Sequence, residues 1–257
     1  MKRFTMLLYG IACYVVFFVT FLYAIGFVGN VGVPKAIDAD PTVPLLTAIG
    51  INVALLTLFA VQHSLMARPF FKRWWTRYVP VAAERSTYVL FSSLALIVLF
   101  AFWEPLGGTV WHITNQSAVI AIYTVFSLGW AVVLVSTFLI NHFDLFGLRQ
   151  AWLYFHGEAY RPLVFKTPFL YRFVRHPLYF GILLAFWSAP VMSVTRLLFA
   201  LIFTLYVIRA IDWEENDLLR EFGDTYRRYS AKVPKIFPRF FNRKSLEPAY
   251  KSIAKKD

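Results

Sequence analysis

Long apolar runs dominate the first 140 residues of the chain. They cover 7–28, 45–66, roughly 86–106 and 118–140. Since a helix needs about 20 apolar residues to cross the hydrocarbon core of a bilayer, each run predicts one membrane-spanning helix. The first run is longer than the ~7–15 apolar residues of a signal peptide, and no small-residue cleavage site follows it, so the pattern favours a retained anchor.

A fifth apolar run, 178–208, is 31 residues long, which is too long for one spanning helix and short for two. The stretch Ser188-Ala189-Pro190 interrupts it in the middle, and Ser193 and Arg196 follow. Because proline removes a backbone donor and breaks or kinks a helix, the pattern predicts a tight helical hairpin with two legs of about 15 residues each.

The basic residues divide unevenly between the two sides of the membrane. If the N-terminus lies in the cytoplasm and the chain crosses at every run, counting the hairpin as two, 24 of the 26 Lys and Arg residues are cytoplasmic. Only Lys35 and Arg196 lie outside. Cytoplasmic loops carry the excess of Lys and Arg, so the charges predict six segments with both ends in the cytoplasm. Treating 178–208 as one span would place 12 basic residues outside.

Composition agrees with a membrane protein. Of 257 residues, 59% are hydrophobic and 16% are charged, against about 45–50% and about 25% in soluble domains. These values exclude an ordinary soluble enzyme, a disordered chain and a coiled coil. The single cysteine excludes a disulfide framework and a cysteine-based metal site, and we expect no metal.

The predicted fold class is therefore all-α. We expect a polytopic helical bundle in one membrane domain over 1–257, with four spanning helices, a C-terminal hairpin, a cytosolic C-terminal helix and a basic interfacial tail over 239–257. The net charge of +12 follows from this topology and from attraction to anionic membrane lipids, so nucleic acid is not an expected partner.

Polar residues gather in four stretches on the predicted cytoplasmic side: 62–68, 141–150, 175–181 and 209–238. Ionisable groups at membrane depth are energetically expensive and indicate function by default. In the last stretch, apolar residues at helical spacing predict a helix, Gly223 marks a break or a close approach, and Val233-Pro234 ends the helix. Taken singly, each polar residue also fits an interfacial or helix-capping role.

Two motifs in the C-terminal third resemble a known signature. Arg175-His176-Pro177-x-Tyr179-x-Gly181 precedes, by about 35 residues, Glu214-Glu215-x-x-Leu218-x-x-x-Phe222-Gly223-x-x-Tyr226-x-x-Tyr229-x-x-x-Val233-Pro234. The pair covers about 172–238 and resembles the superfamily of isoprenylcysteine carboxyl methyltransferases and phospholipid methyltransferases. The resemblance implies an integral membrane enzyme that uses S-adenosylmethionine in a pocket on the cytosolic side.

The stretches 62–68 and 138–150 resemble the NnrU-like branch of this superfamily and, within it, the bacterial methanethiol S-methyltransferases. This resemblance implies in-line attack of a thiolate on the sulfonium methyl group of S-adenosylmethionine, which converts methanethiol into dimethyl sulfide. It also implies a small thiol as the substrate, membrane lipids as surroundings, and a location in the bacterial inner (cytoplasmic) membrane.

The resemblance also assigns cofactor-binding residues. His176, Pro177 and Tyr179 are expected to meet the adenosine or methionine portions, and either Glu214 or Glu215 the ribose hydroxyls or the ammonium group. An aromatic ring at Tyr179 or Trp213 is expected to face the sulfonium. The full expected set is Arg175, His176, Pro177, Tyr179, Gly181, Arg209, Glu214 and Glu215, in which Arg209 pairs with the methionine carboxylate.

The thiol also needs a base, because the thiolate is the nucleophile and a free thiol is mostly protonated near neutral pH. We expect it among Asp144, His63 and His142, in that order of preference, with Tyr179 next. On a helix His142 and Asp144 would point about 200° apart, so the stronger pair is His63 with Asp144, joined by packing of the second and fourth spanning helices. A pocket that selects preformed thiolate would need no base.

Three other functions remain open at this point. One is methyl transfer to an isoprenylcysteine carboxylate or an amino-lipid. Another is a haem protein with His63 or His142 as axial ligand, because NnrU-like proteins include a plastid carotene isomerase thought to use haem. The third is a membrane accessory protein without enzymatic activity. The oligomeric state is also undetermined by the sequence.

Overall fold

The computed structural model describes residues 1–238 as a bundle of long helices. The elements, in chain order, are α1 Lys2–Gly29, α2 Leu45–Ala67, α3 Pro69–Trp75, α4 Val81–Phe102, β1 Thr109–His112, α5 Gln116–Ile140, α6 His142–Leu145, α7 Leu148–His156, the 3-10 helix η1 Phe169–Arg172, α8 Pro177–Trp187, β2 Val191–Ser193, α9 Val194–Phe222 and α10 Asp224–Lys232. The predicted interfacial tail, 239–257, lies outside the described residues.

The predicted spanning helices are confirmed. Five helices, α1, α2, α4, α5 and α9, are long and apolar enough to cross a bilayer. Large apolar side chains such as Leu22, Leu58 and Leu128 are about half exposed on their outer faces, where lipid rather than water is the fitting solvent. The protein is thus an all-α polytopic membrane protein.

The hairpin exists, but its two legs are unequal. Pro177 opens α8, which has only 11 residues, whereas α9 has 29. The helix α9 continues far beyond Ile208, so the predicted separate cytosolic helix is partly its C-terminal half and partly α10. Gly223 separates the two with φ +51°, and a Cβ there would meet nothing within 4 Å, so this glycine marks a helix break and not a close approach.

The turn of the hairpin contains a short strand that the apolar pattern did not predict. Strand β2 pairs antiparallel with β1, which lies between α4 and α5. The prediction failed because strands of three and four residues are too short for a period-2 pattern to emerge.

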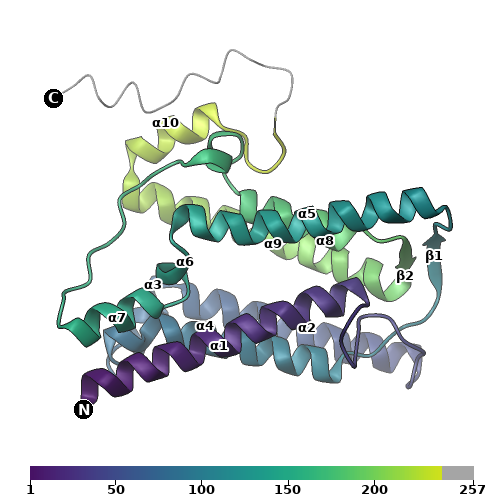
Figure 1. The fold of residues 1–257 in the computed structure, drawn as a ribbon, viewed down its shortest axis with the longest axis horizontal. Helices are drawn as coiled ribbons and strands as arrows, with labels where there is room; N and C mark the ends of the chain where they lie inside the picture. Colours follow the sequence, from purple (N-terminus) through teal and green to yellow (C-terminus); the bar gives the residue numbers. More distant parts are fainter. Residues whose placement is uncertain (239–257) are drawn as a thin grey trace.

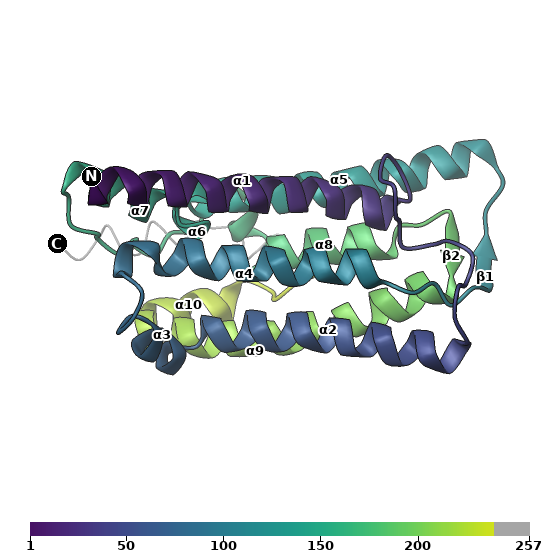
Figure 2. The same ribbon diagram turned by 90° about the horizontal axis from the view of Figure 1, so that it is seen from below.

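The six helices of the two halves of the chain form two layers (Figures 1 and 2). In the first layer α4 lies between α1 and α2, and in the second α8 lies between α5 and α9. Aromatic and aliphatic side chains fill the space between the layers, among them Phe27, Leu99, Trp130, Phe186 and Phe199. The apolar core therefore holds the N-terminal half against the C-terminal half.

The segments that carry most of the basic residues lie at one end of this bundle, on the left in Figure 1. The helices α1, α4 and α8 begin at this end, α2, α5 and α9 finish there, and α3, α6, α7 and α10 lie there. We call it the basic end. Among the Lys and Arg residues that the structure describes, only Lys35 and Arg196 lie at the opposite end, which we call the far end. This agrees with the charge pattern of the sequence.

A buried arginine joins the two layers at the far end. Arg196, at the start of α9, is 3% exposed, and its Nε lies 3.5 Å from a carboxylate oxygen of Asp38 in the α1–α2 loop. Its guanidinium also donates to the carbonyl of Val28. Ser193, which caps α9 by accepting from the Arg196 amide, donates to the same Asp38 carboxylate. This cluster explains why an arginine interrupts an apolar stretch without belonging to a ligand site.

Two glycines let α5 and α8 approach each other closely. A Cβ at Gly181 would lie 2.6 Å from the carbonyl oxygen of Gly129, and one at Gly129 would lie 2.8 Å from that of Gly181. Small residues allow such close backbone packing in membrane helices. The glycine of the motif at 181 is therefore required by helix packing, whatever its relation to a cofactor.

Replacement of Gly181 by alanine should destabilise the bundle by about 1–3 kcal/mol, because backbone atoms of Gly129 and Val133 block the new methyl group. A thermal melt of the purified protein in detergent measures this as a lower Tm. The matched control is Gly50→Ala in α2, where nothing lies within 4 Å and the change should be neutral or stabilising by up to about 1 kcal/mol. Equal melting temperatures for both variants would contradict the close approach.

Candidate functional site

The Arg175-His176-Pro177 segment docks onto the segment that follows α10. The amides of Arg175 and His176 donate to the carbonyls of Pro234 and Lys235 at 2.9 and 3.1 Å. The Arg175 guanidinium also donates to the carbonyl of Val233 at 3.1 Å. A residue before proline is disfavoured in the helical region, and His176, with φ −123° and ψ 63°, is not helical, so α8 begins at Pro177. Two distant segments thereby share one wall at the basic end.

Glu215 is the shared carboxylate beneath this wall. Its Oε1 lies 2.8 Å from Arg175 Nε and 3.1 Å from His176 Nε2, and its Oε2 lies 3.5 Å from Lys235 Nζ. A hydrogen bond and ion pair with Asp212, 2.8 Å away, raise the pKa of Lys235, so the lysine stays charged. Glu215 thus has little acceptor capacity left for a ligand.

Glu214, one residue earlier, has a different environment. Its side chain is 45% exposed, and its nearest basic group is His176 Nδ1 at 3.8 Å. The Tyr179 ring lies against the His176 ring, with centroids 5.8 Å apart. Since consecutive residues of a helix point about 100° apart, one carboxylate can hold the wall together while its neighbour remains an open acceptor.

The α10 helix closes the site from outside through aromatic packing. Tyr226 and Tyr229 are buried against Phe165, with ring centroids 6.0 and 5.5 Å apart. Phe165 in turn packs on Phe222, with ring centroids 5.2 Å apart. Tyr229 donates to the carbonyl of Tyr171 at 2.6 Å. Burial raises the pKa of Tyr226, and the nearby Glu215 carboxylate raises it further, so its hydroxyl remains protonated. The predicted apolar helix face is therefore an inner face.

Contacts between α2 and α9 complete the basic end. Ser64 and Tyr206 share a hydrogen bond of 3.0 Å, and Arg68 pairs with Asp217 at 3.2 Å. The guanidiniums of Arg68 and Arg209 each lie 5.5 Å from the Trp213 ring centroid. Arg209 is exposed and lies about 140° around α9 from Glu214. The structure therefore does not place Arg209 on the same helix face as the open carboxylate.

His63 lies where the two layers meet. Its ring stacks on Phe59 at 5.2 Å, and its nitrogens lie 2.9 and 3.1 Å from the hydroxyl of Tyr88 and 3.1 Å from Ser92 Oγ. From the second layer, Tyr206 packs on the other side of Phe59, with ring centroids 6.3 Å apart. His63, Tyr88 and Tyr206 thus form a polar group in an apolar core, which we call the tyrosine cluster.

His142 belongs to a separate hydrogen-bond network in the bend between α5 and α7, which we call the elbow. Its Nδ1 lies 2.8 Å from Thr137 Oγ1 and its Nε2 2.8 Å from the Tyr14 hydroxyl, and the ring stacks on Phe138 at 4.1 Å. Thr137 donates its own proton to the carbonyl of Leu134, so Nδ1 of His142 must donate to Thr137 and Nε2 must accept from Tyr14. Burial lowers the pKa of His142, which favours this neutral, fully bonded form.

Asp144 is paired elsewhere. Arg149 donates to its carboxylate at 2.7 Å and Tyr160 at 3.4 Å, and neither His63 nor His142 is a partner. The expected pairing of His63 with Asp144 is wrong for a physical reason: α2 packs on α4 and α9, whereas α5 packs on α8, so the two helices lie on opposite sides of the bundle (Figure 2). The three expected base residues are therefore not brought together.

Sequence analysis missed the partners of His63. Tyr88 and Ser92 lie in a long apolar run, and Tyr206 lies in another. A usable signal was present, because Tyr88 and Ser92 stand four residues apart and so share one face of a membrane helix, where polar side chains must find partners.

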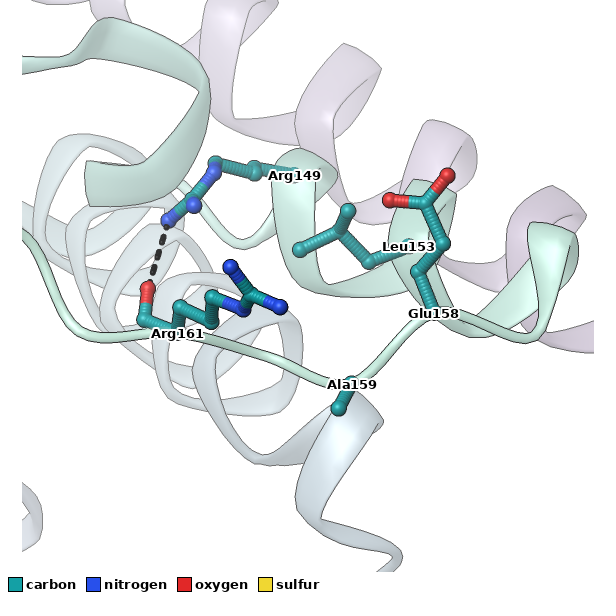
Figure 3. A pocket seen from close by; sticks show the side chains of 5 residues that line it. All are labelled: Arg149, Leu153, Glu158, Ala159 and Arg161. Carbon is teal, nitrogen blue, oxygen red and sulfur yellow. Dashed lines mark hydrogen bonds between the residues drawn. The ribbon is translucent and has the colours of Figure 1, made fainter.

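A surface hollow at the basic end lies outside this arrangement. It is lined by Arg149, Leu153, Glu158, Ala159 and Arg161, along α7 and the segment after it, and Arg149 donates to the Arg161 carbonyl across it at 3.3 Å (Figure 3). None of its residues belongs to the two motifs. Among the described residues, no group of three or more His, Cys, Asp and Glu side chains is arranged to hold a metal ion.

Comparison with known proteins gives clear relatives. The chain is 52% identical over 245 residues to the methanethiol S-methyltransferase of Crocosphaera subtropica, which covers 95% of this chain and 96% of the relative. It is 48% identical over 238 residues to that of Mycobacterium tuberculosis, covering 93% and 98%. The rat protein nurim is more distant, at 32% identity over 183 residues, 68% of this chain and 69% of nurim.

No family model matches the chain, and no solved structure matches it. The near full-length identity to several enzymes of one name decides the matter. This protein belongs to the methanethiol S-methyltransferase family.

Proposed function

We propose that this protein methylates methanethiol with S-adenosylmethionine as donor and releases dimethyl sulfide. The observation that carries the proposal is identity of about half to methanethiol S-methyltransferases over almost the whole chain. The open carboxylate of Glu214 beside His176 supports it. Detection of dimethyl sulfide above cells that express the gene and are fed methanethiol tests it directly.

The residues around Glu214 fit a nucleoside-type cofactor. A half-exposed carboxylate accepts hydrogen bonds from ribose hydroxyls or an ammonium group, and the wall made by Arg175, His176 and Glu215 holds it in place. We assign Glu214 to the cofactor and Glu215 to the wall. Bound S-adenosylmethionine would supply an electrophilic methyl group. Tyr206 precedes Glu214 by about two turns of α9 and bonds to Ser64 at 3.0 Å, which makes the neighbouring tyrosine cluster the fitting place for the thiol.

Among the three candidate bases, the geometry favours His63. It belongs to the tyrosine cluster, whereas His142 has both nitrogens bonded at the α5 elbow and Asp144 is paired with Arg149. A small apolar thiol offers little binding energy, so a tight cavity must align it. A neutral imidazole next to that cavity can take the thiol proton. His142 and Asp144 then hold the elbow between α5 and α7.

The alternatives have less support. The relatives at 43–52% identity are named methanethiol S-methyltransferases and none of these is named for a prenylated or lipid acceptor. His63 and His142, the candidate haem ligands, both have their ring nitrogens bonded to side chains of this chain.

The basic end is proposed to face the cytoplasm, in the inner membrane, with both termini on that side. A fluorescent reporter fused after Asp257 should fluoresce, and alkaline phosphatase inserted near Lys35 should be active, because α10, the last described helix, and Lys35 lie at opposite ends of the bundle. The reverse pair of fusions, with alkaline phosphatase after Asp257 and the fluorescent reporter near Lys35, serves as the control. Phosphatase activity at the C-terminal position would contradict this orientation.

Separate replacement of the two neighbouring carboxylates by glutamine should distinguish their roles. Glu214→Gln should weaken S-adenosylmethionine binding about 10-fold, roughly 1.4 kcal/mol, with Tm unchanged, because only an open acceptor is lost. Glu215→Gln should lower stability by about 1–3 kcal/mol, since it leaves Arg175 and His176 without their charged acceptor. Calorimetric titration and thermal melting measure the two effects, and an unchanged affinity of the Glu214 variant would refute its assignment.

Removal of the proposed base should slow methyl transfer selectively. His63→Gln should reduce kcat by about 10²–10⁴-fold while the affinity for S-adenosylmethionine stays near normal. Higher pH should partly restore turnover, because more thiol is then ionised without help. His142→Gln serves as the control and should alter turnover only as far as it alters stability. Normal turnover of the His63 variant at neutral pH would place the base elsewhere.

A further inference from the structure

The surface hollow along α7 contains charged groups that the chain itself leaves unpaired. The hollow has a volume of about 500 Å³, and Arg149, Arg161 and Glu158 belong to its lining. Among the described residues, Arg149 pairs with Asp144, whereas Arg161 and Glu158 form no ion pair. In the view of Figure 3, Leu153 lies between Arg149 and Glu158. The hollow thus offers cationic donors on one side and an anionic acceptor on the other.

Arg149 is held in place and still has donors to spare. Its Nη1 donates to Asp144 Oδ1 at 2.7 Å and to the Arg161 carbonyl at 3.3 Å, and its guanidinium lies 5.3 Å from the centroid of the Tyr160 ring. In the part of the chain that the structure describes, no hydrogen bond uses its Nε or Nη2. Because the guanidinium is planar and one edge of it is fixed, the other edge is oriented for a phosphate.

Two more arginines lie near Arg149 at this corner of the bundle. Arg161 lines the same hollow, and its carbonyl is bonded to Arg149. Arg3, at the start of α1, reaches the end of α7, since a Cβ on Gly157 would lie 2.7 Å from Arg3 Nη1. Neither Arg3 nor Arg161 forms an ion pair with a described residue. Like charges that are close together repel, so an anion bound among them would relieve this repulsion.

The hollow lies at the depth where lipid headgroups are expected. The helix α7 packs along the start of α1, where its end, Gly157, meets Arg3. In the next turns of α1, the apolar side chains of Phe4 and Leu8 are half exposed, on a helix that can span a membrane. Trp152 of α7 is also half exposed, and tryptophan is enriched at the border between membrane and water. A phospholipid at this border would have its phosphate level with the hollow.

We propose that this hollow binds the headgroup of a membrane phospholipid. Arg149 and Arg161 take the phosphate, and Glu158 accepts a hydrogen bond from a donor at the end of the head. An ammonium or a hydroxyl group can donate to a carboxylate, whereas a trimethylammonium group carries no N–H and cannot. The hollow is therefore selective for phosphatidylethanolamine and phosphatidylglycerol over phosphatidylcholine. This inference goes beyond the proposed function and does not depend on it.

The bound lipid would tie the segment after α7 to the rest of the bundle. That segment contributes Arg161 to the hollow and then leads to Phe165, whose ring packs against Tyr226 and Tyr229 of α10. A ligand that binds only the folded protein stabilises it. The lipid therefore acts as a structural ligand that supports the packing of α10, and it is not a methyl acceptor.

The test is titration of the purified, delipidated full chain in detergent with the three phospholipids, all with the same acyl chains, followed by native mass spectrometry. Phosphatidylethanolamine and phosphatidylglycerol should bind about 10-fold more tightly than phosphatidylcholine, because only they donate to Glu158. Arg161→Gln should weaken the binding of both by about 10-fold, through loss of a charged donor to the phosphate. Glu158→Ala should reduce the preference over phosphatidylcholine to within about twofold.

The matched control is Arg77→Gln, which removes the same charge from an exposed arginine at the basic end, outside the hollow. Its lipid affinities should stay within about twofold of wild type. Arg161→Lys keeps the charge without the planar fork and should fall between wild type and Arg161→Gln. Since Arg161 and Glu158 are exposed, the Tm of every variant without lipid should be near that of wild type, which shows that the variants are folded.

The outcomes decide the proposal without a measurement of methyl transfer. Equal affinity for the three lipids, or equal losses in the Arg161→Gln and Arg77→Gln variants, would overturn it. Displacement of the lipid by millimolar inorganic phosphate would also overturn it and assign the hollow to free phosphate. Dimethyl sulfide production is a separate readout, so a chain that fails to methylate methanethiol can still show this lipid selectivity, and the reverse also holds.

Discussion

The basic end depends on one carboxylate, that of Glu215, which lies beside three basic side chains. Arg175 and His176 come from the segment before α8, and Lys235 from the segment after α10. The covalent chain separates Arg175 from Lys235 by some 60 positions, and this one carboxylate lies beside both. Because Glu215 is a residue of α9, its contacts also fix the orientation of that helix. The neighbouring carboxylate, Glu214, stays half-exposed.

The two-layer architecture explains why polar groups meet in an apolar bundle. Each half of the chain brings three helices, and polar side chains that face out of one layer must find partners in the other. At the far end this need is met by Arg196 and Asp38, which lock the halves together. Towards the basic end it is met by hydroxyls and an imidazole, which hold no fixed charge. The two layers are thus joined by charged groups at the far end and by neutral hydrogen-bonding groups in the core towards the basic end.

Much of the fold could be predicted from the sequence, because apolar runs, prolines and basic residues act locally. The spanning helices, the hairpin and the break at Gly223 all followed from such signals. The length of α8 and the strand pairing did not, since both depend on where a distant segment stops the chain. The candidate site was likewise predictable only in part. The motif around His176 and Glu215 was visible, whereas the partner of His63 is set by which helices are neighbours, and no local pattern reports that α2 packs on α4 and not on α5.

The three histidines at the basic end show how partners, and not residue type, decide a role. His176 lies 3.1 Å from the Glu215 carboxylate, which holds it as part of a wall. His142 is bonded on both nitrogens to groups of its own elbow, and burial lowers its pKa, so it stays neutral and structural. His63 instead stacks on Phe59, which in turn packs on Tyr206 of α9. It therefore lies where the two layers meet, and this placement is why we propose His63, and not His142 or His176, as the base.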